Sequence, residues 1–245
     1  MNNIIKLSVY NFKNVAKTNG FILSFAASIF YVLLWIYLKP KAFIVVDYQF
    51  EFFRVVNFII LYYSCAALGK EIVYGTSKIL FTAPLSRTSV IIEKLLVIFL
   101  FGLLYWLCSR ILEIAAILRI TKKLDMGSIF SLSSVKSLAI YMIISFVLGS
   151  FCLMVTVLTL NFNSTLVLSV GVFGILQFFI PLFYNLRFNS GLTLAEQIIT
   201  LTPNYIMFCW LEFWNISVKE TTIMMLWGSL FLTISLFSIN RRSIK

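Results

Sequence analysis

Few residues in this chain of 245 carry side chains suited to catalysis, and their types exclude most enzyme classes. The sequence contains no histidine. A Ser-His-Asp triad, a Cys-His pair and a histidine-ligated zinc site are therefore excluded. The four cysteines lie far apart inside apolar stretches, and we interpret them as small apolar filler: Cys65, Cys108, Cys152 and Cys209.

A nucleotide site is also missing from the sequence. A P-loop requires the pattern Gly-x4-Gly-Lys-Ser/Thr. The nearest approach is Gly69-Lys70, where Ser64 replaces the first glycine and Glu71 follows the lysine. We therefore expect no cofactor, no metal and no enzymatic activity in this chain.

The composition is that of an integral membrane protein. Hydrophobic residues make up 61% of the chain and charged residues only 12%, with 25 Phe, 11 Tyr and five Trp. Soluble domains hold about 25% charged residues, and a soluble protein of this composition would expose large apolar patches. Disordered, disulfide-rich secreted and nucleic-acid-binding classes are excluded.

Six stretches are long and apolar enough to cross a bilayer, because a helix needs about 20 apolar residues to do so. They cover about 20–38, 53–69, 95–118, 137–160, 164–183 and 222–239. Two of them come from the uncharged run between Lys136 and Arg187, which is too long for one crossing and bends most naturally at residues 161–164. The sequence predicts an all-α, polytopic membrane protein.

Polar residues inside these stretches are the candidates for function. Arg110 and Glu113 lie three residues apart and share a helix face. Charges within a membrane mark function by default, but these two fall near the end of their stretch, which favours a local ion pair. Gln177 either lines a pathway or hydrogen-bonds between helices.

Three segments outside the spans have patterns of their own. Residues 3–17 combine an apolar stripe with Lys6, Lys13 and Lys17, which predicts an interfacial helix whose lysines contact anionic lipid headgroups. Residues 70–94 form a loop with a short helix. Residues 192–214 predict two short re-entrant outer helices, broken at Pro203, whose aromatic side chains anchor in an aromatic belt: Tyr205, Trp210, Phe213 and Trp214.

Lysines and arginines divide almost evenly between the two sides of this topology, so the positive-inside rule decides little. Six crossings place both termini on one side, and we assign that side to the cytoplasm.

The loop at 70–94 contains a spaced motif: a glutamate four residues before Gly-Thr, a proline nine residues after that glycine, then Ser-Arg and a lysine. Its residues, with the tyrosine before the glycine, are Glu71, Tyr74, Gly75, Thr76, Pro84, Ser86, Arg87 and Lys94. This motif resembles that of the permease subunits of ABC-2 type transporters. A second acid of the family is Val73 here, and the glycine before the lysine is Glu93.

The resemblance implies a single ABC-2 type transmembrane domain over residues 1–245. The loop would be a cytoplasmic coupling helix that docks on a separate ATPase, which binds ATP and Mg. Two ATPase copies and a second permease, identical or homologous, would complete the exporter in a bacterial cell membrane. We expect the substrate pathway to involve Gln177, Phe178, Pro203 and Tyr205.

The aromatic, weakly charged spans suit a hydrophobic or amphipathic substrate, and similar small permeases export antimicrobial peptides or give immunity to them. Lipid and drug export remain alternatives. A small channel or membrane sensor without an ATPase is the alternative from another class, and a polytopic enzyme is disfavoured because paired acids and histidine are missing from the spans.

Overall fold

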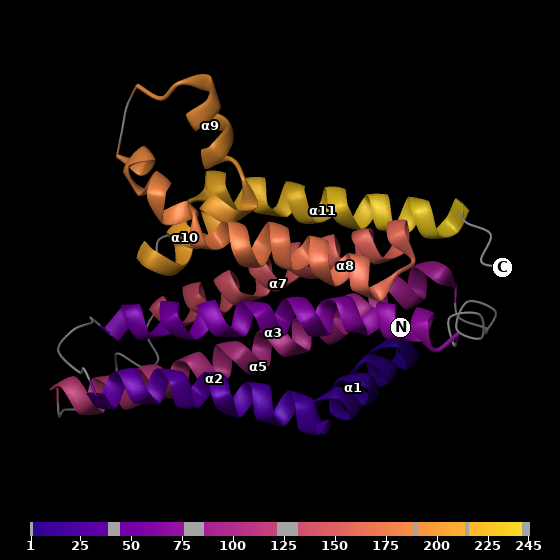
Figure 1. Ribbon diagram of the computed structural model, residues 1–245, viewed down its shortest axis with the longest axis horizontal. Coiled ribbons are helices and arrows are strands. Elements are labelled where there is room, and N and C mark those ends of the chain that lie inside the picture. Colours follow the sequence, from indigo (N-terminus) through magenta and orange to yellow (C-terminus); the bar gives the residue numbers. More distant parts are fainter. Residues whose placement is uncertain are drawn as a thin grey trace.

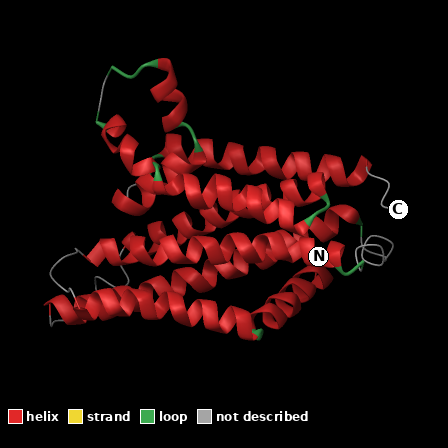
Figure 2. Cartoon of the chain, in the orientation of Figure 1, coloured by secondary structure: helices red, strands yellow, loops and turns green. Residues whose placement is uncertain are grey.

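The computed structural model describes residues 2–38, 45–75, 86–121, 132–188, 191–213 and 216–241. Every regular element in these ranges is helical, as the sequence predicts (Figure 2). The α-helices are α1 (Asn2–Ala16), α2 (Asn19–Leu38), α3 (Val45–Val73), α5 (Arg87–Thr121), α7 (Leu132–Thr159), α8 (Phe162–Ser169), α9 (Leu194–Thr200), α10 (Pro203–Phe213) and α11 (Val218–Arg241). A π-helix, η1 (Val170–Ile175), and two 3-10 helices, η2 (Leu176–Phe178) and η3 (Ile180–Arg187), follow α8.

Five of these helices are long and apolar enough to cross a membrane: α2, α3, α5, α7 and α11. The run from α8 to η3 is a sixth candidate if its two halves form one span, but they are bent by 58° on either side of Phe179. The chain is therefore a multi-pass membrane protein with five or six candidate spans. The span predicted over about 164–183 falls on this bent helical run.

The candidate spans lie side by side in one bundle (Figure 1). The start of α1, the end of α3 and the end of α11 lie at one end of the bundle, and α9 and α10 lie at the other (Figure 1). Helix α7 is central, since it packs against α3, α5, α8 and α11. Its fully buried side chains include Ile140, Ile144, Val147, Leu148 and Cys152.

Glycines allow α7 to approach its neighbours closely. A Cβ atom at Gly102 of α5 would lie 2.9 Å from the Cβ of Ser145 and 3.4 Å from the carbonyl oxygen of Tyr141. Gly228 of α11 faces the ring of Phe146 in the same way. Small residues at helix crossings are typical of membrane bundles, where close backbone approach replaces the hydrophobic driving force.

The turn between α7 and α8 lies where the sequence predicts it. Leu160 takes a left-handed conformation, with φ of 50°. The Asn161 side chain then caps α8 by accepting hydrogen bonds from the backbone N–H groups of Asn163 and Ser164. An asparagine cap satisfies donors that have no partner within the helix.

The break after α8 is stabilised by two asparagines from other helices. The Nδ2 atoms of Asn57 on α3 and Asn204 on α10 donate to the carbonyl oxygens of Phe173 and Val172, at 2.7 and 2.8 Å. Both carbonyls lie in the π-helix, where the regular α-helical bonding is interrupted. Backbone groups at such a break need partners inside the protein, because lipid supplies none.

The loop predicted over 70–94 is shorter than expected. Helix α3 continues through Val73 and α5 begins at Arg87. Glu71 therefore lies on α3, which no proline interrupts, and Lys94 lies on α5. The expected short helix, with Thr76 and Pro84, lies outside the described residues.

The predicted aromatic belt is wrong for two of its members. Trp210 is 0% exposed and Tyr205 is 4% exposed, so both lie within the protein core. Helix α10 packs against α3, α7 and α11, which covers these rings. The indole Nε1 of Trp210 donates to Glu220 at 2.9 Å. Phe213 is half-buried, and Trp214 lies outside the described residues.

Candidate functional site

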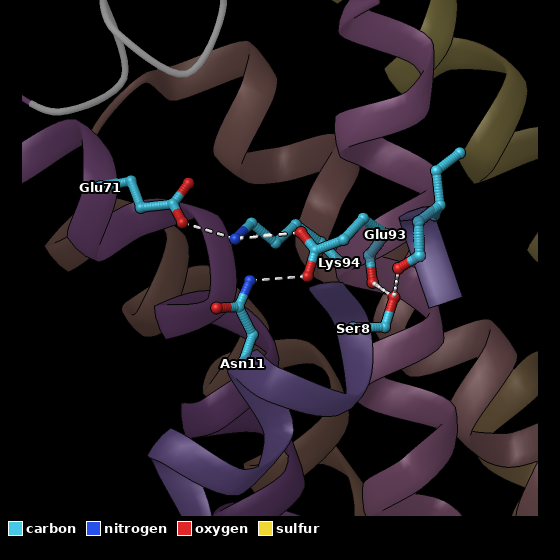
Figure 3. A network of polar contacts seen from close by, with 6 residues as sticks. Ser8, Asn11, Glu71, Glu93 and Lys94 are labelled. Carbon is cyan, nitrogen blue, oxygen red and sulfur yellow. Dashed lines mark hydrogen bonds and ion pairs between the residues drawn. The ribbon is translucent and has the colours of Figure 1, made fainter. Parts of the chain in front are cut away.

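Three helices meet at a buried ion cluster formed by Glu71, Glu93 and Lys94 (Figure 3). The Nζ atom of Lys94 on α5 lies 2.5 Å from Oε1 of Glu71 on α3 and 3.1 Å from Oε2 of Glu93. The side chains of Lys94 and Glu93 are only 4% and 2% exposed. Charges this deeply buried require partners, because removing each charge from water costs roughly several kcal/mol.

Helix α1 completes the cluster. Asn11 Nδ2 donates to Oε1 of Glu93 at 2.8 Å, and the hydroxyl of Ser8 donates to the Glu93 carbonyl oxygen at 3.3 Å (Figure 3). Phe12 packs its ring against Phe101 of α5, with 5.0 Å between centroids. The cluster therefore joins α1 directly to α5 and, through the Lys94–Glu71 pair, to the end of α3.

A second set of contacts fixes the ends of that segment. Gly75 has φ of +69°, a conformation that favours glycine and ends α3. The Ser86 hydroxyl accepts a hydrogen bond from the Ser89 N–H at 3.1 Å and caps α5. The guanidinium of Arg87 donates to the carbonyl oxygen of Ile239 at 2.9 Å, which joins the start of α5 to the end of α11. Tyr74 is exposed beside Gly75.

A cavity of about 460 Å³ opens beside the ion cluster. Its lining comes from α1, α3, α5 and the start of α2. The rings of Tyr62, Tyr63 and Phe101 form an apolar wall, and Lys70, Glu71 and Lys94 supply charge. The Lys70 ammonium lies 5.5 Å from the centre of the Tyr62 ring, within cation–π distance.

Of the lysines expected at the interface, Lys6 and Lys13 lie on α1, and Lys17 follows its last residue. All three are exposed. The opposite side of the helix, with Ser8 buried, packs against α5.

Arg110 and Glu113 form an ion pair near the other end of the bundle. The Glu113 carboxylate also accepts a hydrogen bond from Gln49 of α3. The side chains of Arg110 and Glu113 are mostly buried. The pair and its hydrogen bond to Gln49 therefore join α3 to α5 and act as a structural contact.

The four residues expected along a substrate pathway have different surroundings. Gln177 is buried and accepts a hydrogen bond from Asn57 at 2.7 Å. Phe178 is 56% exposed and stacks on Phe58. Pro203 begins α10, where it and Tyr205 are buried.

Sequence reasoning missed the partners in the ion cluster and the partner of Gln177. Glu93 is notable in the sequence only as a departure from a family pattern, and no sequence pattern indicates Ser8, Asn11 or Asn57. Asn11 and Glu93 are 82 positions apart, so no local pattern connects them. A carboxylate directly before a lysine in an apolar stretch was the one available signal.

The fold and the site define a helical multi-pass membrane protein whose α1, α3 and α5 are joined by a buried ion cluster. The described residues contain no group of three or more His, Cys, Asp or Glu side chains placed to hold a metal. A comparison with known protein families finds none that matches the chain, and a comparison with curated proteins finds no match.

Proposed function

We propose that this chain is the permease subunit of an ATP-driven exporter of the ABC-2 type. The observation that carries the proposal is the ion pair between Glu71 and Lys94, the first and last residues of the matching motif. It clamps together the two helices that flank the proposed coupling helix. If a partner pushes on the segment between α3 and α5, this ion pair makes the two helices move together.

The contacts around the clamp support a mechanical role. Glu93 and Asn11 connect it to α1, and Arg87 connects the start of α5 to α11. A displacement of the segment between α3 and α5 would therefore reach four helices at once. Coupling of this kind requires a contiguous network of packed and hydrogen-bonded groups.

The remaining parts follow from this proposal. Six spans place both termini in the cytoplasm of a bacterial cell, with α1 in the membrane interface and α9 and α10 as outer re-entrant helices. ATP and Mg bind a separate P-loop ATPase, because the sequence holds no P-loop. This ATPase is present in two copies. A second permease, identical or homologous, completes the pathway for a hydrophobic or amphipathic substrate, with a peptide favoured.

Purification of the tagged chain from its native membrane in mild detergent tests the proposal. Mass spectrometry should identify a stoichiometric P-loop ATPase. Arg87→Ala should reduce ATP-driven transport by the purified complex while the permease stays folded, because α5 is released from α11. Lys136→Ala removes an exposed charge at the start of α7 and is the matched control. Absence of an ATPase, both here and after co-expression with candidate ATPases, would contradict the proposal and favour a channel.

A further inference from the structure

The cavity beside the ion cluster lies at the ends of two candidate spans. Gly20 is at the start of the α2 span, and Lys70 and Glu71 are near the end of the α3 span. Because both span ends line the same cavity, we expect its depth to be near the junction of the hydrocarbon and headgroup regions. Exposed Lys13 lies on α1, the helix that forms another wall, and exposed Lys17 follows the end of this helix.

The lining divides into an apolar part and a polar part. Tyr62, Val97 and Phe101 form a wall that suits an acyl chain. Asn14 and Lys70 supply donors that suit a phosphate. This combination matches a phospholipid, in which a charged headgroup adjoins an apolar tail.

The charge of Lys70 favours an anionic group in the ligand. Lys94 is shared between Glu71 and Glu93, whereas no carboxylate of the described residues lies within ion-pair distance of Lys70. Lys70 is therefore the lining cation with which a phosphate can pair. A volume of about 460 Å³ is within the range of about 300–1,000 Å³ for small-molecule sites. It accommodates a headgroup and the first part of one acyl chain.

We infer that this cavity binds one anionic phospholipid, with its phosphate at Lys70 and an acyl chain against Tyr62 and Phe101. The lipid adjoins Glu71 and Lys94, so its binding couples the membrane composition to the position of α1. This inference does not depend on an ATPase partner, and it is tested without one.

Native mass spectrometry of the purified chain, titrated with phosphatidylglycerol or phosphatidylcholine, measures this binding. The wild type should bind one phosphatidylglycerol more tightly than phosphatidylcholine. Lys70→Gln should weaken phosphatidylglycerol binding about fivefold, the effect of about 1 kcal/mol expected for one lysine. Its control, Lys136→Gln, removes a charge at the opposite end of the bundle and should bind like the wild type.

A second variant tests the cavity itself. Ala67→Phe places a ring inside the cavity and should abolish the tight phosphatidylglycerol adduct. Its control, Ala26→Phe, makes the same change on an exposed face of α2. Equal affinity for both lipids, or wild-type binding by either Lys70→Gln or Ala67→Phe, would overturn the inference. An unchanged unfolding midpoint of Lys70→Gln establishes that a loss of binding is not a loss of folding.

Discussion

The ammonium group of Lys94 lies 2.5 Å from Glu71 and 3.1 Å from Glu93, so one cation pairs with carboxylates on two helices. The two contacts are not equivalent, since Glu93 is almost completely buried while Glu71 is partly exposed.

Removal of the cation should therefore cost far more than removal of the outer carboxylate. Lys94→Met leaves Glu93 buried without its counter-ion and should lower the free energy of unfolding by about 3–5 kcal/mol. Glu71→Gln leaves Lys94 paired with Glu93 and should cost about 1–2 kcal/mol. Denaturant titration in detergent measures both. Equal losses for the two variants would show that Glu93 does not rely on Lys94.

Asn57 should be essential to the break after α8. Asn57→Leu removes the donor to the Phe173 carbonyl and to Gln177 and should cost about 1–3 kcal/mol, because both acceptors stay buried. Hydrogen exchange over residues 173–178 should accelerate. Asn163→Leu is the control, since Asn163 is exposed in the turn before this segment. Unchanged exchange in Asn57→Leu would contradict the capping role.

The crossing of α5 and α7 should tolerate no added atom at Gly102. Gly102→Ala brings a methyl group against Ser145 and should lower the free energy of unfolding by about 1–3 kcal/mol. Gly171→Ala meets no atom within 4 Å and should be close to neutral. Thermal unfolding of the two variants makes the comparison. A neutral Gly102→Ala would mean that the helices can separate at no cost.

The start of α9 should depend on pH through Glu196. Hydrogen bonds from the Thr193 hydroxyl and backbone N–H, at 2.7 and 2.8 Å, lower the pKa of Glu196 below its ordinary value. The stabilisation is complete above the unfolded pKa of about 4.3 and is lost as pH falls through the lower folded value. Hydrogen exchange of α9, corrected for intrinsic rates, should increase over that range. Thr193→Ala removes the hydroxyl but keeps the backbone N–H and should reduce this pH dependence, whereas Glu196→Gln should remove it. Persistence of the dependence in Glu196→Gln would assign it to another group.

Fold class was predictable from the sequence because hydrophobic runs and helix breakers are local features. The turn at Asn161 followed from the one polar spot in an uncharged run. Helix ends were less predictable, since α3 and α5 continue past the apolar stretches into Glu71 and Lys94. Glu71 and Lys94 can lie on these helices because their side chains form an ion pair inside the protein.

The surroundings of aromatic and polar residues could not be predicted in the same way. Tryptophan is a residue type typical of interfacial anchors, but Trp210 is covered by neighbouring helices. Gln177 was recognisable as a buried polar residue, but its partner Asn57 lies 120 positions away. Such pairs depend on tertiary packing, which no spacing along the chain reveals.

Photo-crosslinking from Tyr74 tests the proposed docking of an ATPase most directly. Tyr74 is 73% exposed at the end of α3, and Tyr37 is 71% exposed at the end of α2, at the opposite end of the bundle. Each tyrosine is replaced by p-benzoylphenylalanine in the native membrane, and the adducts are identified by mass spectrometry after irradiation. The account predicts a covalent adduct with a P-loop ATPase from position 74 and none from position 37. An ATPase adduct from position 37 alone, or none from position 74, would contradict it.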